Sequence, residues 1–337
     1  MKKMTKENID KLIGSGNFPE VANSIELIET HISWVIVCDD FVYKIKKNLH
    51  YSFLDFSTLK KRKFYCEREI ELNKRLTTGI YIDVQPVKYK ADIFIGEGEG
   101  KIIDYAVKMH RVDREKQMDK LLLRDKVSVT DIKNLAEKIS SFHKQAKIIE
   151  SDGSKNIGEL FNDLLSQEDF LKNHLLCSRL IEDALEASGQ FLKNNKMLLE
   201  ERIAKGYVRD CHGDLHSRNI FLLPDPQPFD CIEFNDALRQ IDVLNEIAFL
   251  CMDLDAFGRK DLADLFVGYY STLLPAMQSG EDKMLFIYYK AYRANIRAKV
   301  NSLRAKDAAN ETELKKALDE VYKYLLLMNG YLLALRK

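Results

Sequence analysis

The residues best suited to chemistry lie in one segment of the 337-residue chain, CHGDLHSRNIFLLPDPQPFDCIEFND, from Cys211 to Asp236. It contains the carboxylates of Asp214 and Asp230 and the carboxamide of Asn219. A carboxylate can accept the proton of an attacking hydroxyl, while an amide oxygen and a second carboxylate can hold a magnesium ion that bridges nucleotide phosphates. These residue types, in this order, favour phosphoryl transfer to a hydroxyl.

The elements predicted around these groups are a loop followed by a hairpin. The loop covers residues 212–219 and the hairpin covers residues 220–234. Apolar runs at 220–223 and 229–234 predict its two strands, joined by the proline-rich turn PDP. Asp230 stands at the start of the returning strand, so the hairpin is expected to fold it back towards the loop.

The same segment resembles a known catalytic loop. HGDLHSRN is similar to the HGDxxxxN loop of the aminoglycoside phosphotransferase and choline kinase families, which share the protein-kinase fold, and its Asp-to-Asn spacing equals that of the protein-kinase loop. FDCIEFND and IDVLNEIAFLCMDLD resemble one branch, the N-terminal domain of bacterial bifunctional aminoglycoside phosphotransferase/ATP-binding proteins. The resemblance runs from about Ile25 to about Leu303. It implies the fold and the reaction type, but not an aminoglycoside acceptor.

The resemblance implies an α+β protein-kinase-like fold with two lobes. Residues 1–109, with a leading helix within residues 1–16, are expected to form a small antiparallel β lobe with one key helix. Residues 110–337 are expected to form a larger, mostly helical lobe that carries the loop and the hairpin. The length and the 46% hydrophobic content are sufficient for such cores.

In the small lobe, strand and helix patterns place charged groups that suit phosphate. SIELIET, SWVIVCD and FVYKIKK alternate like strands, and Lys44 and Lys46 share one face of the third. The resemblance makes Lys44 the phosphate-binding lysine, with Lys46 as the alternative. Residues 57–76 predict a helix with Glu67 and Glu69, and CERE resembles the VERE of aminoglycoside phosphotransferases, which assigns Glu67 as the partner of the lysine. Solvated lysines and an ordinary surface glutamate are the alternatives.

Two further nucleotide contacts are expected from position. The turn ETHIS at residues 29–33 lacks the glycines of protein-kinase phosphate loops, so its backbone amides are expected to wrap phosphate with help from the hydroxyls of Thr30 and Ser33. Backbone groups near Met109 and Arg111, at the end of the last strand of the small lobe, are expected to meet an adenine.

The resemblance implies ATP and Mg²⁺ as cofactors. Asp214 would be the base or the group that orients the hydroxyl, while Asn219 and Asp230 would bind Mg²⁺. Glu233 is the alternative metal ligand, because its IEF resembles the IDF of relatives. The expected activity is transfer of the γ-phosphate of ATP to an alcohol group of a small molecule.

Two residues are expected to support the loop without doing chemistry. His212 would pack beneath it as a structural prop. The spacing from Asp230 to Asp242 matches that of the related kinases, in which the second aspartate accepts hydrogen bonds from the loop backbone. A plain N-cap of the following helix is the alternative role for Asp242.

Other functions use some of the same residues. His212, Asp214 and His216 form an H-x-D-x-H cluster, which alone would suit a zinc or two-metal hydrolase but leaves Asn219 and Asp230 unexplained. A catalytically silent nucleotide-binding regulator and a kinase acting on a polypeptide are further alternatives. Because every chemical position is filled, a silent regulator is disfavoured.

Two motifs on expected helices allow two interpretations each. Arg293, Arg297 and Arg304 lie on a helix over residues 286–305, where a solvated face is favoured over a basic wall for substrate. His143, at the end of a core helix, is favoured as a packed structural histidine over a ligand.

Composition excludes some partners. Lys and Arg total 52 and Asp and Glu total 52, so a nucleic acid held by bulk charge is not expected. The six cysteines are scattered, and no apolar span is long enough for a signal peptide or a membrane helix, so a cytoplasmic protein is expected. No G-x-x-x-x-G-K-[ST] occurs, which predicts the form without a second, P-loop kinase domain.

Overall fold

The computed structural model describes residues 4–51, 54–150, 157–175 and 177–336, and the chain divides into two compact units. The first unit comprises Met1–Gln117, Asn219–Leu223 and Gln227–Asp236. The second comprises Met118–Arg218, Pro224–Pro226 and Ala237–Lys337.

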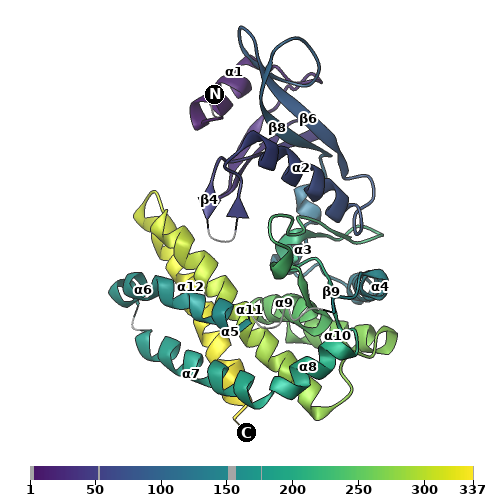
Figure 1. Ribbon diagram of the computed structural model, residues 1–337, viewed down its shortest axis with the longest axis vertical. Coiled ribbons are helices and arrows are strands. Elements are labelled where there is room, and N and C mark those ends of the chain that lie inside the picture. The colour runs from purple at the N-terminus through teal and green to yellow at the C-terminus, as the bar shows by residue number, and fades with distance from the viewer. Residues whose placement is uncertain (1–3, 52–53, 151–156, 176, 337) are drawn as a thin grey trace. The chain divides into compact units, whose positions relative to one another are not determined.

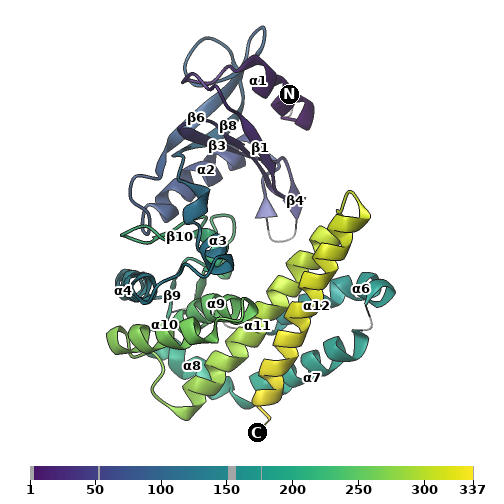
Figure 2. The ribbon, with the colours of Figure 1, turned by 180° about the vertical axis from the view of Figure 1, so that it is seen from behind.

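A six-stranded antiparallel sheet forms the centre of the first unit (Figure 1). Its order is β1-β2-β3-β8-β6-β7, with β1 at Glu26–Glu29, β2 at Ser33–Val37, β3 at Phe41–Lys46, β6 at Tyr81–Tyr89, β7 at Ile93–Ile95 and β8 at Lys101–His110. Helix α2 (Leu59–Asn73) packs on β8 and β6, and α1 (Lys6–Ser15) packs on β7. A short ribbon pairs β4 (His50–Tyr51) with β5 (Leu54–Asp55). Figure 2 shows the same sheet from behind.

The alternation of side chains along β3 decides where its lysines point. Tyr43 and Ile45 are buried in the apolar core on the α1 side of the sheet. Successive side chains of a strand point to opposite faces, so Lys44 and Lys46 point to the face that α2 covers. The predicted shared face of the two lysines is therefore confirmed. Thr58 caps α2 by accepting a hydrogen bond from the N–H of Lys61, which fixes where the helix begins.

The hairpin after the predicted catalytic loop is shorter than expected. β10 (Ile220–Phe221) pairs with β11 (Gln227–Pro228), so the prediction of a returning strand over residues 229–234 is wrong. Asp230 has a φ of 63°, in the left-handed region, and this conformation ends the extended run.

The hairpin strands also belong to the first unit, whereas the sequence placed residues 220–234 with the larger lobe. The first unit continues to Gln117, past the expected boundary at Met109, and the chain returns to it from Asn219 to Leu223 and from Gln227 to Asp236. Two segments distant in sequence therefore build this unit together.

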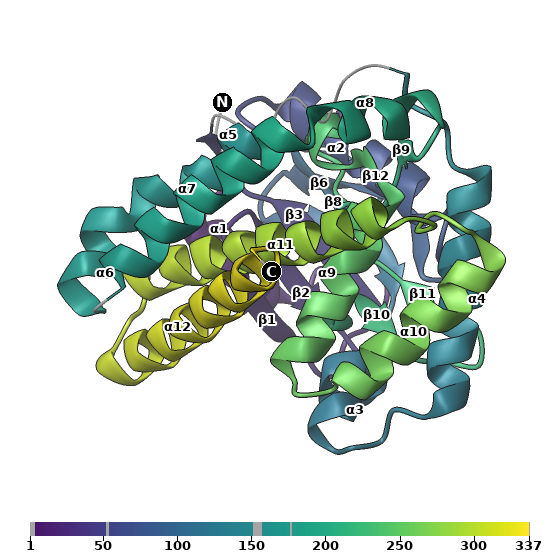
Figure 3. The same cartoon turned by 90° about the horizontal axis from the view of Figure 1, so that it is seen from below.

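The second unit is mostly helical (Figure 3). Its helices are α3 (Met118–Leu123), α4 (Val129–Gln145), α5 (Ile157–Asn162), α6 (Glu168–His174), α7 (Ser178–Asn194), α8 (Lys196–Ala204), α9 (Val243–Ala256), α10 (Lys260–Leu273), α11 (Gly280–Lys306) and α12 (Glu311–Ala334). A ribbon of β9 (Val208–Asp210) and β12 (Gln240–Asp242) joins them. α11 and α12 lie side by side, and α9 packs against α11 and α10.

Helix α9 is the core of the second unit, because every residue from Val243 to Leu254 is buried. It directly follows β12, whose partner β9 leads into residue 211, so the ribbon and α9 together position the predicted loop. None of the helices in the described part of the chain is long and apolar enough to cross a membrane. The predicted α+β class, with a β-rich and a helical part, is confirmed.

Candidate active site

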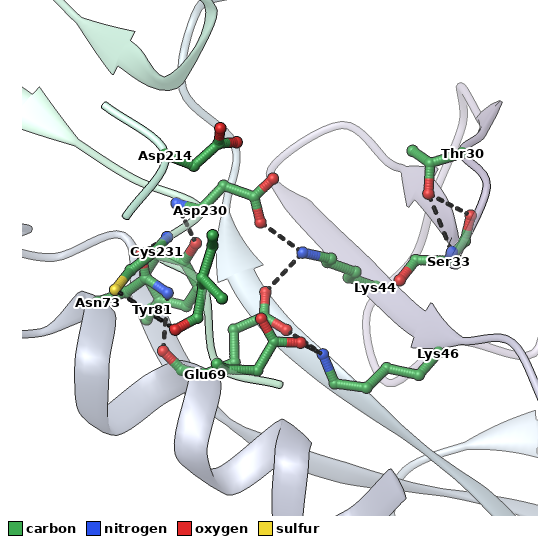
Figure 4. A network of polar contacts seen from close by, with 12 residues as sticks. Thr30, Ser33, Lys44, Lys46, Glu69, Asn73, Tyr81, Asp214, Asp230 and Cys231 are labelled. Carbon is green, nitrogen blue, oxygen red and sulfur yellow. Dashed lines mark hydrogen bonds and ion pairs between the residues drawn. The ribbon is translucent and has the colours of Figure 1, made fainter. Parts of the chain in front are cut away.

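Five charged side chains of the first unit form one continuous chain of ion pairs (Figure 4). Glu69 of α2 accepts a hydrogen bond from Lys44 at 2.8 Å and another from Lys46 at 2.6 Å. Lys44 also donates to Asp230 at 2.6 Å, and Lys46 donates to Glu233. Three carboxylates thus alternate with two ammonium groups, and β3, α2 and the segment after the hairpin each contribute.

Asp230 and Glu233, at the two ends of this series of ion pairs, differ in solvent exposure. Lys46 and Glu69 are fully buried and Glu233 is 4% exposed, whereas the side chain of Asp230 is 44% exposed. Burial would lower the pKa of Lys44, but Asp230, Glu69 and Glu233 outweigh burial and hold that pKa well above its ordinary value. The Lys44 ammonium is therefore charged, and it lies beside the one accessible carboxylate of the five residues.

The pKa values of Glu69 and Glu233 are shifted in opposite directions. Burial would raise the pKa of Glu69, but Lys44 and Lys46 outweigh it and lower the pKa to about 2. For Glu233, burial dominates over the attraction of Lys46 and raises the pKa above its ordinary value. Glu69 is thus the permanent negative charge that holds both lysines.

The prediction that Glu67 partners the strand lysine is wrong. The Glu67 side chain is 53% exposed and pairs with Lys63, one turn away on the same helix, at 3.4 Å. The side of α2 that faces the sheet instead carries Arg62, Cys66 and Glu69, which follow the spacing of three to four residues that puts side chains on one helix face. Glu67 directly follows Cys66 in the helix, so its side chain falls outside the buried face and points to solvent.

Two residues that sequence reasoning missed hold Asp230 in position. Asn73, one turn after Glu69 on α2, accepts the N–H of Cys231 at 2.9 Å and donates to the carbonyl of Glu69 at 2.8 Å. The hydroxyl of Tyr81 accepts the N–H of Asp230 at 3.2 Å. These contacts stabilise the left-handed backbone of Asp230. The only signal in the sequence was the position of Asn73, four residues after Glu69 on the same helix face.

The three predicted metal ligands all belong to the first unit, but they differ in how accessible they are. Asp230 presents a half-exposed carboxylate, which suits a hard cation. Glu233 is buried in its ion pair with Lys46, which leaves it less available. Asn219 is 8% exposed, and its carbonyl oxygen accepts the N–H of Phe229 at 2.9 Å, which fixes the backbone on which it sits. Asp230 therefore fits Mg²⁺ better than Glu233 does, whereas Asn219 is almost as buried as Glu233 and stays a predicted ligand.

The turn between β1 and β2 uses its hydroxyl groups internally. The Thr30 hydroxyl donates to the carbonyl of Ser33 at 3.0 Å and accepts the Ser33 N–H at 2.9 Å (Figure 4). The Ser33 hydroxyl is fully buried and has no hydrogen-bond partner among the described residues. The phosphate contacts predicted from these two hydroxyls stay a prediction, and Thr30 is the more exposed of the two residues.

The backbone near the expected adenine contacts is also already engaged. The Arg111 N–H donates to the carbonyl of Asp40 at 2.8 Å. Met109 lies within the central strand β8, between Val42 of β3 and Tyr81 of β6, and its side chain is 9% exposed. The adenine contacts predicted for backbone groups near Met109 and Arg111 therefore stay a prediction.

In the second unit, the predicted loop presents Asp214. Its Oδ2 lies 3.5 Å from Nε2 of His216, and its N–H donates to Nδ1 of the fully buried His212 at 3.2 Å. His212 therefore supports the loop from inside. Burial would raise the pKa of Asp214, but His216, Arg297 and His212 hold it well below its ordinary value. The side chain remains 35% exposed, so an ionised carboxylate is accessible.

Two carboxylates of α9 hold the backbone of this loop. Glu246, which is fully buried, accepts the N–H of His212 at 2.6 Å and the N–H of Gly213 at 2.9 Å. Asp253 accepts both the N–H and the hydroxyl of Ser217. Glu246 and Asp253 are two helical turns apart, so they share one face of α9.

The prediction that Asp242 accepts these backbone hydrogen bonds is wrong. Its carboxylate accepts the N–H of Leu244 at 2.8 Å, which makes it the N-cap of α9, and it pairs with the buried Arg202 at 2.9 Å. Both interactions occur at the start of the helix, one turn before Glu246. The N-cap alternative is therefore the one that the structure shows.

The hydrolase alternative is not supported by the positions of potential metal ligands. Among the described residues, one group of three offers ligand atoms within 4.8 Å of one another, namely His143, Cys211 and Glu246. It contains no member of the H-x-D-x-H cluster. Its members also have other partners, because Glu246 binds the loop backbone and Nδ1 of His143 lies 2.7 Å from the Tyr270 hydroxyl. His143 is thus the packed structural histidine that the sequence favours.

Comparison with known sequences gives a partial match. No protein-family model matches the chain. Two uncharacterized proteins, one from Mycobacterium tuberculosis and one from Mycobacterium bovis, are each 29% identical to it over 287 residues. The match covers 83% of this chain and 55% of each relative, so the chain spans about half the length of the curated relatives it matches.

Solved structures share the fold over almost the whole chain. The GDP complex of a mutant aminoglycoside 2'-phosphotransferase-IIIa has a TM-score of 0.53 at 14% identity and covers 95% of this chain and 97% of its own. A choline/ethanolamine kinase family protein from Mesorhizobium loti has a TM-score of 0.51 at 11% identity, covering 96% and 98%. A thermostable mutant of aminoglycoside phosphotransferase APH(4)-Ia has 0.52 at 10% identity, with the same coverage. The chain therefore has the fold of the aminoglycoside phosphotransferases and choline/ethanolamine kinases, as the sequence resemblance predicts.

The shared carboxylate of Glu69 leads to a prediction about stability. Glu69→Gln is expected to lower the free energy of unfolding by about 3–5 kcal/mol, because two buried lysines lose their common counter-charge. Glu67→Gln, two residues away on the exposed face, is expected to change it by less than about 0.5 kcal/mol. Urea unfolding of both variants measures the difference. Equal effects would contradict the assignment of Glu69 as the partner of the lysines.

The hydrogen bonds that Glu246 accepts from the loop backbone lead to a prediction about local dynamics. Glu246→Gln replaces one accepting oxygen by an amide nitrogen, so the amides of His212 and Gly213 are expected to exchange with solvent faster. Asp242→Asn, one turn earlier, is the matched control and should lower global stability without exposing these two amides selectively. Amide hydrogen exchange followed by mass spectrometry measures both, and selective loss of protection in the Asp242 variant would reverse our assignment.

Proposed function

We propose that this protein is a magnesium-dependent phosphotransferase that moves the terminal phosphate of a nucleoside triphosphate to a hydroxyl of a small molecule. The observation that carries the proposal is the position of Lys44, whose side chain is 12% exposed, charged and held between Glu69 and Asp230. A lysine fixed by a helix glutamate is the group that kinases use to bind nucleotide phosphates. The shared fold supports the proposal.

Each unit contributes a different part of the chemistry in this proposal. In the first unit, Lys44 binds phosphate oxygens, and Asp230 and Asn219 would hold Mg²⁺, which neutralises charge on the phosphates when bound. In the second unit, Asp214 receives the hydroxyl of the acceptor. Because its pKa is held well below the ordinary value, Asp214 is a weak base at neutral pH. Its role is therefore to orient the hydroxyl by accepting its hydrogen bond, with proton transfer late in the reaction.

The charge balance of these five ion-paired residues favours a nucleotide that binds together with a metal ion. Asp230, Glu69 and Glu233 carry three negative charges against the two positive charges of Lys44 and Lys46. A bare triphosphate would meet this excess of negative charge, and Lys44 would have to exchange Asp230 for phosphate and leave that carboxylate without a counter-charge. Mg²⁺ provides the missing counter-charge for Asp230.

Nucleotide binding is the first test of the proposal. A millimolar mixture of Mg²⁺ and ATP is expected to raise the melting temperature, since a ligand that binds only the folded state stabilises it. ATP with a chelator should have a much smaller effect, because Asp230 repels bare phosphate. GTP belongs beside ATP in this assay, since one protein of the same fold was crystallised with GDP. Absence of a shift with both magnesium nucleotides would contradict the proposal.

The second test separates the roles of two aspartates. Asp214→Asn is expected to leave Mg-nucleotide affinity nearly unchanged and to reduce turnover by about 10²–10⁴-fold, since it removes a group that acts on the hydroxyl. Asp230→Asn is expected to weaken both metal dependence and turnover. Asparagine tolerates the left-handed backbone at this position, so the change tests charge and not folding.

Calorimetry of Mg-nucleotide binding and a nucleotide-consumption assay, applied to both variants, measure these effects. Parental binding and turnover in Asp230→Asn would rule out our metal site. The hydrolase alternative predicts the reverse pattern, in which Asp214 and His216 changes remove a metal and Asp230 is nearly silent.

A further inference from the structure

Three arginines run along one face of α11 in the second unit. Arg293, Arg297 and Arg304 are separated by four and seven residues, which are about one and two helical turns. Arg293 and Arg297 are each only 5% exposed, so the solvated face that the sequence favours is wrong for these two. Buried guanidinium groups need partners, because an arginine carries five N–H donors and cannot lose its charge.

Arg293 has partners for two of its nitrogens, which connect α11 to the predicted loop, while its Nη2 is buried without a partner among the described residues. Its Nε donates to Oδ1 of Asn245 at 2.7 Å, and its Nη1 donates to the carbonyl of Gly213 at 3.1 Å. Its guanidinium lies 4.7 Å from the ring centroid of Phe249. Arg293, the first of the three arginines, therefore contacts the backbone of Gly213, the residue that precedes Asp214.

Arg297, one turn further on, is not satisfied in the same way. Its Nε and Nη2 are buried and have no hydrogen-bond partner among the described residues. The guanidinium lies 5.5 Å from the ring centroid of Tyr324, and a side-chain hydrogen bond to Tyr324 contributes to raising its pKa. Two unpaired donors of a buried cation are costly, and a bound oxyanion would satisfy both.

Two carboxylates act on Arg297 from a greater distance, and both have other partners. Burial would lower the pKa of Arg297, but Tyr324, Asp253 and Asp214 raise it. Asp253 already binds Ser217. Asp214 already lies beside His216. Their attraction explains how a charged arginine is retained here, but it leaves the two donors unfilled.

Arg304 and Arg218 add further positive charge near Arg297. Burial and then the like charges of Arg297 and Arg218 lower the pKa of Arg304. Arg304 is exposed, and its one side-chain hydrogen bond runs to Asn301 at 3.5 Å, which leaves its charge uncompensated within the described residues. Arg218 belongs to the loop itself and lies 4.0 Å from Asp119. Three guanidinium groups thus raise the positive potential beside Asp214.

We propose that Arg297, flanked by Arg304 and Arg218, binds an anionic group of the acceptor, so that the substrate is a hydroxyl compound bearing a carboxylate or a phosphate. This inference rests on the proposed phosphotransferase function and specifies its acceptor class. Arginine donates two parallel hydrogen bonds to such oxyanions, which matches its two unfilled donors. The same charges repel polycations, so aminoglycosides do not fit as acceptors.

Binding of matched compounds at constant ionic strength tests the inference without requiring turnover. The probes are D-gluconate beside neutral D-sorbitol, D-glucose 6-phosphate beside neutral D-glucose, and cationic D-glucosamine. In isothermal titration calorimetry without nucleotide, at least one anion is expected to bind more tightly than its neutral partner. Arg297→Met is expected to weaken that binding about 10- to 100-fold, whereas Arg297→Lys should restore part of it.

Two controls secure the interpretation. Lys283→Met removes a positive charge from an exposed position of α11 and should leave anion binding unchanged. Arg304→Met alters an exposed residue, so it tests the proposed anion site even if Arg297→Met fails to fold, and it should weaken anion binding about severalfold. Titration with Mg-ATP distinguishes an acceptor anion from a nucleotide phosphate. If Arg297→Met weakens Mg-ATP and not the anionic probes, the inference is wrong.

Failure of the inference and failure of the proposed function give different results. If no anion binds more tightly than its neutral partner, the inference is overturned. It is also overturned if a neutral or cationic acceptor is phosphorylated and Arg297→Met leaves its kcat/KM unchanged, although phosphotransfer then stands. If anions bind through Arg297 but neither ATP nor GTP is consumed with any of them, the anion site stands and the proposed phosphotransferase function fails.

Discussion

The buried carboxylate of Glu69 is the interaction on which the first unit depends. It is the common counter-charge of Lys44 and Lys46, and each lysine then reaches a second carboxylate on the segment after the hairpin. Buried charges of this kind are tolerated only when they are paired. The pairing that makes the buried lysines tolerable also ties β3, α2 and the segment after the hairpin together, so the position of Lys44 and the cohesion of the unit have one origin.

In the second unit, the buried carboxylates of α9 are paired with neutral groups instead of lysines. Its loop presents backbone N–H groups, and buried carboxylates of α9 accept them, while Arg293 donates to a carbonyl of the loop. The backbone of the loop that carries Asp214 is thus held by side chains of α9 and α11.

Periodicity in the sequence was sufficient for the strands, the main helices and the face on which the lysines lie, because these follow from short-range alternation. Periodicity did not decide which of two neighbouring glutamates pairs with the lysines. Glu67 and Glu69 are two residues apart on α2, and the buried face of that helix contains Arg62 and Asn73, so apolar residues did not mark it. A search for buried polar residues at spacings of three to four would have selected Glu69. The returning strand was mispredicted because a single left-handed aspartate interrupts an otherwise apolar run, and sequence patterns do not reveal that conformation.

The route of the chain has a consequence for how the protein is made. Lys44 and Asp230 are 186 residues apart in sequence, and Lys46 and Glu233 are 187 apart. During synthesis the sheet and α2 leave the ribosome long before these partners do, and closing so large a loop has an entropic cost that must be met before the contacts form. Until then the growing chain holds two lysines against one glutamate and cannot complete the interior of its first unit. An amino-terminal fragment that ends at Gln117 lacks those carboxylates altogether, so the first unit is completed only after residues 118–218 of the helical unit have been translated.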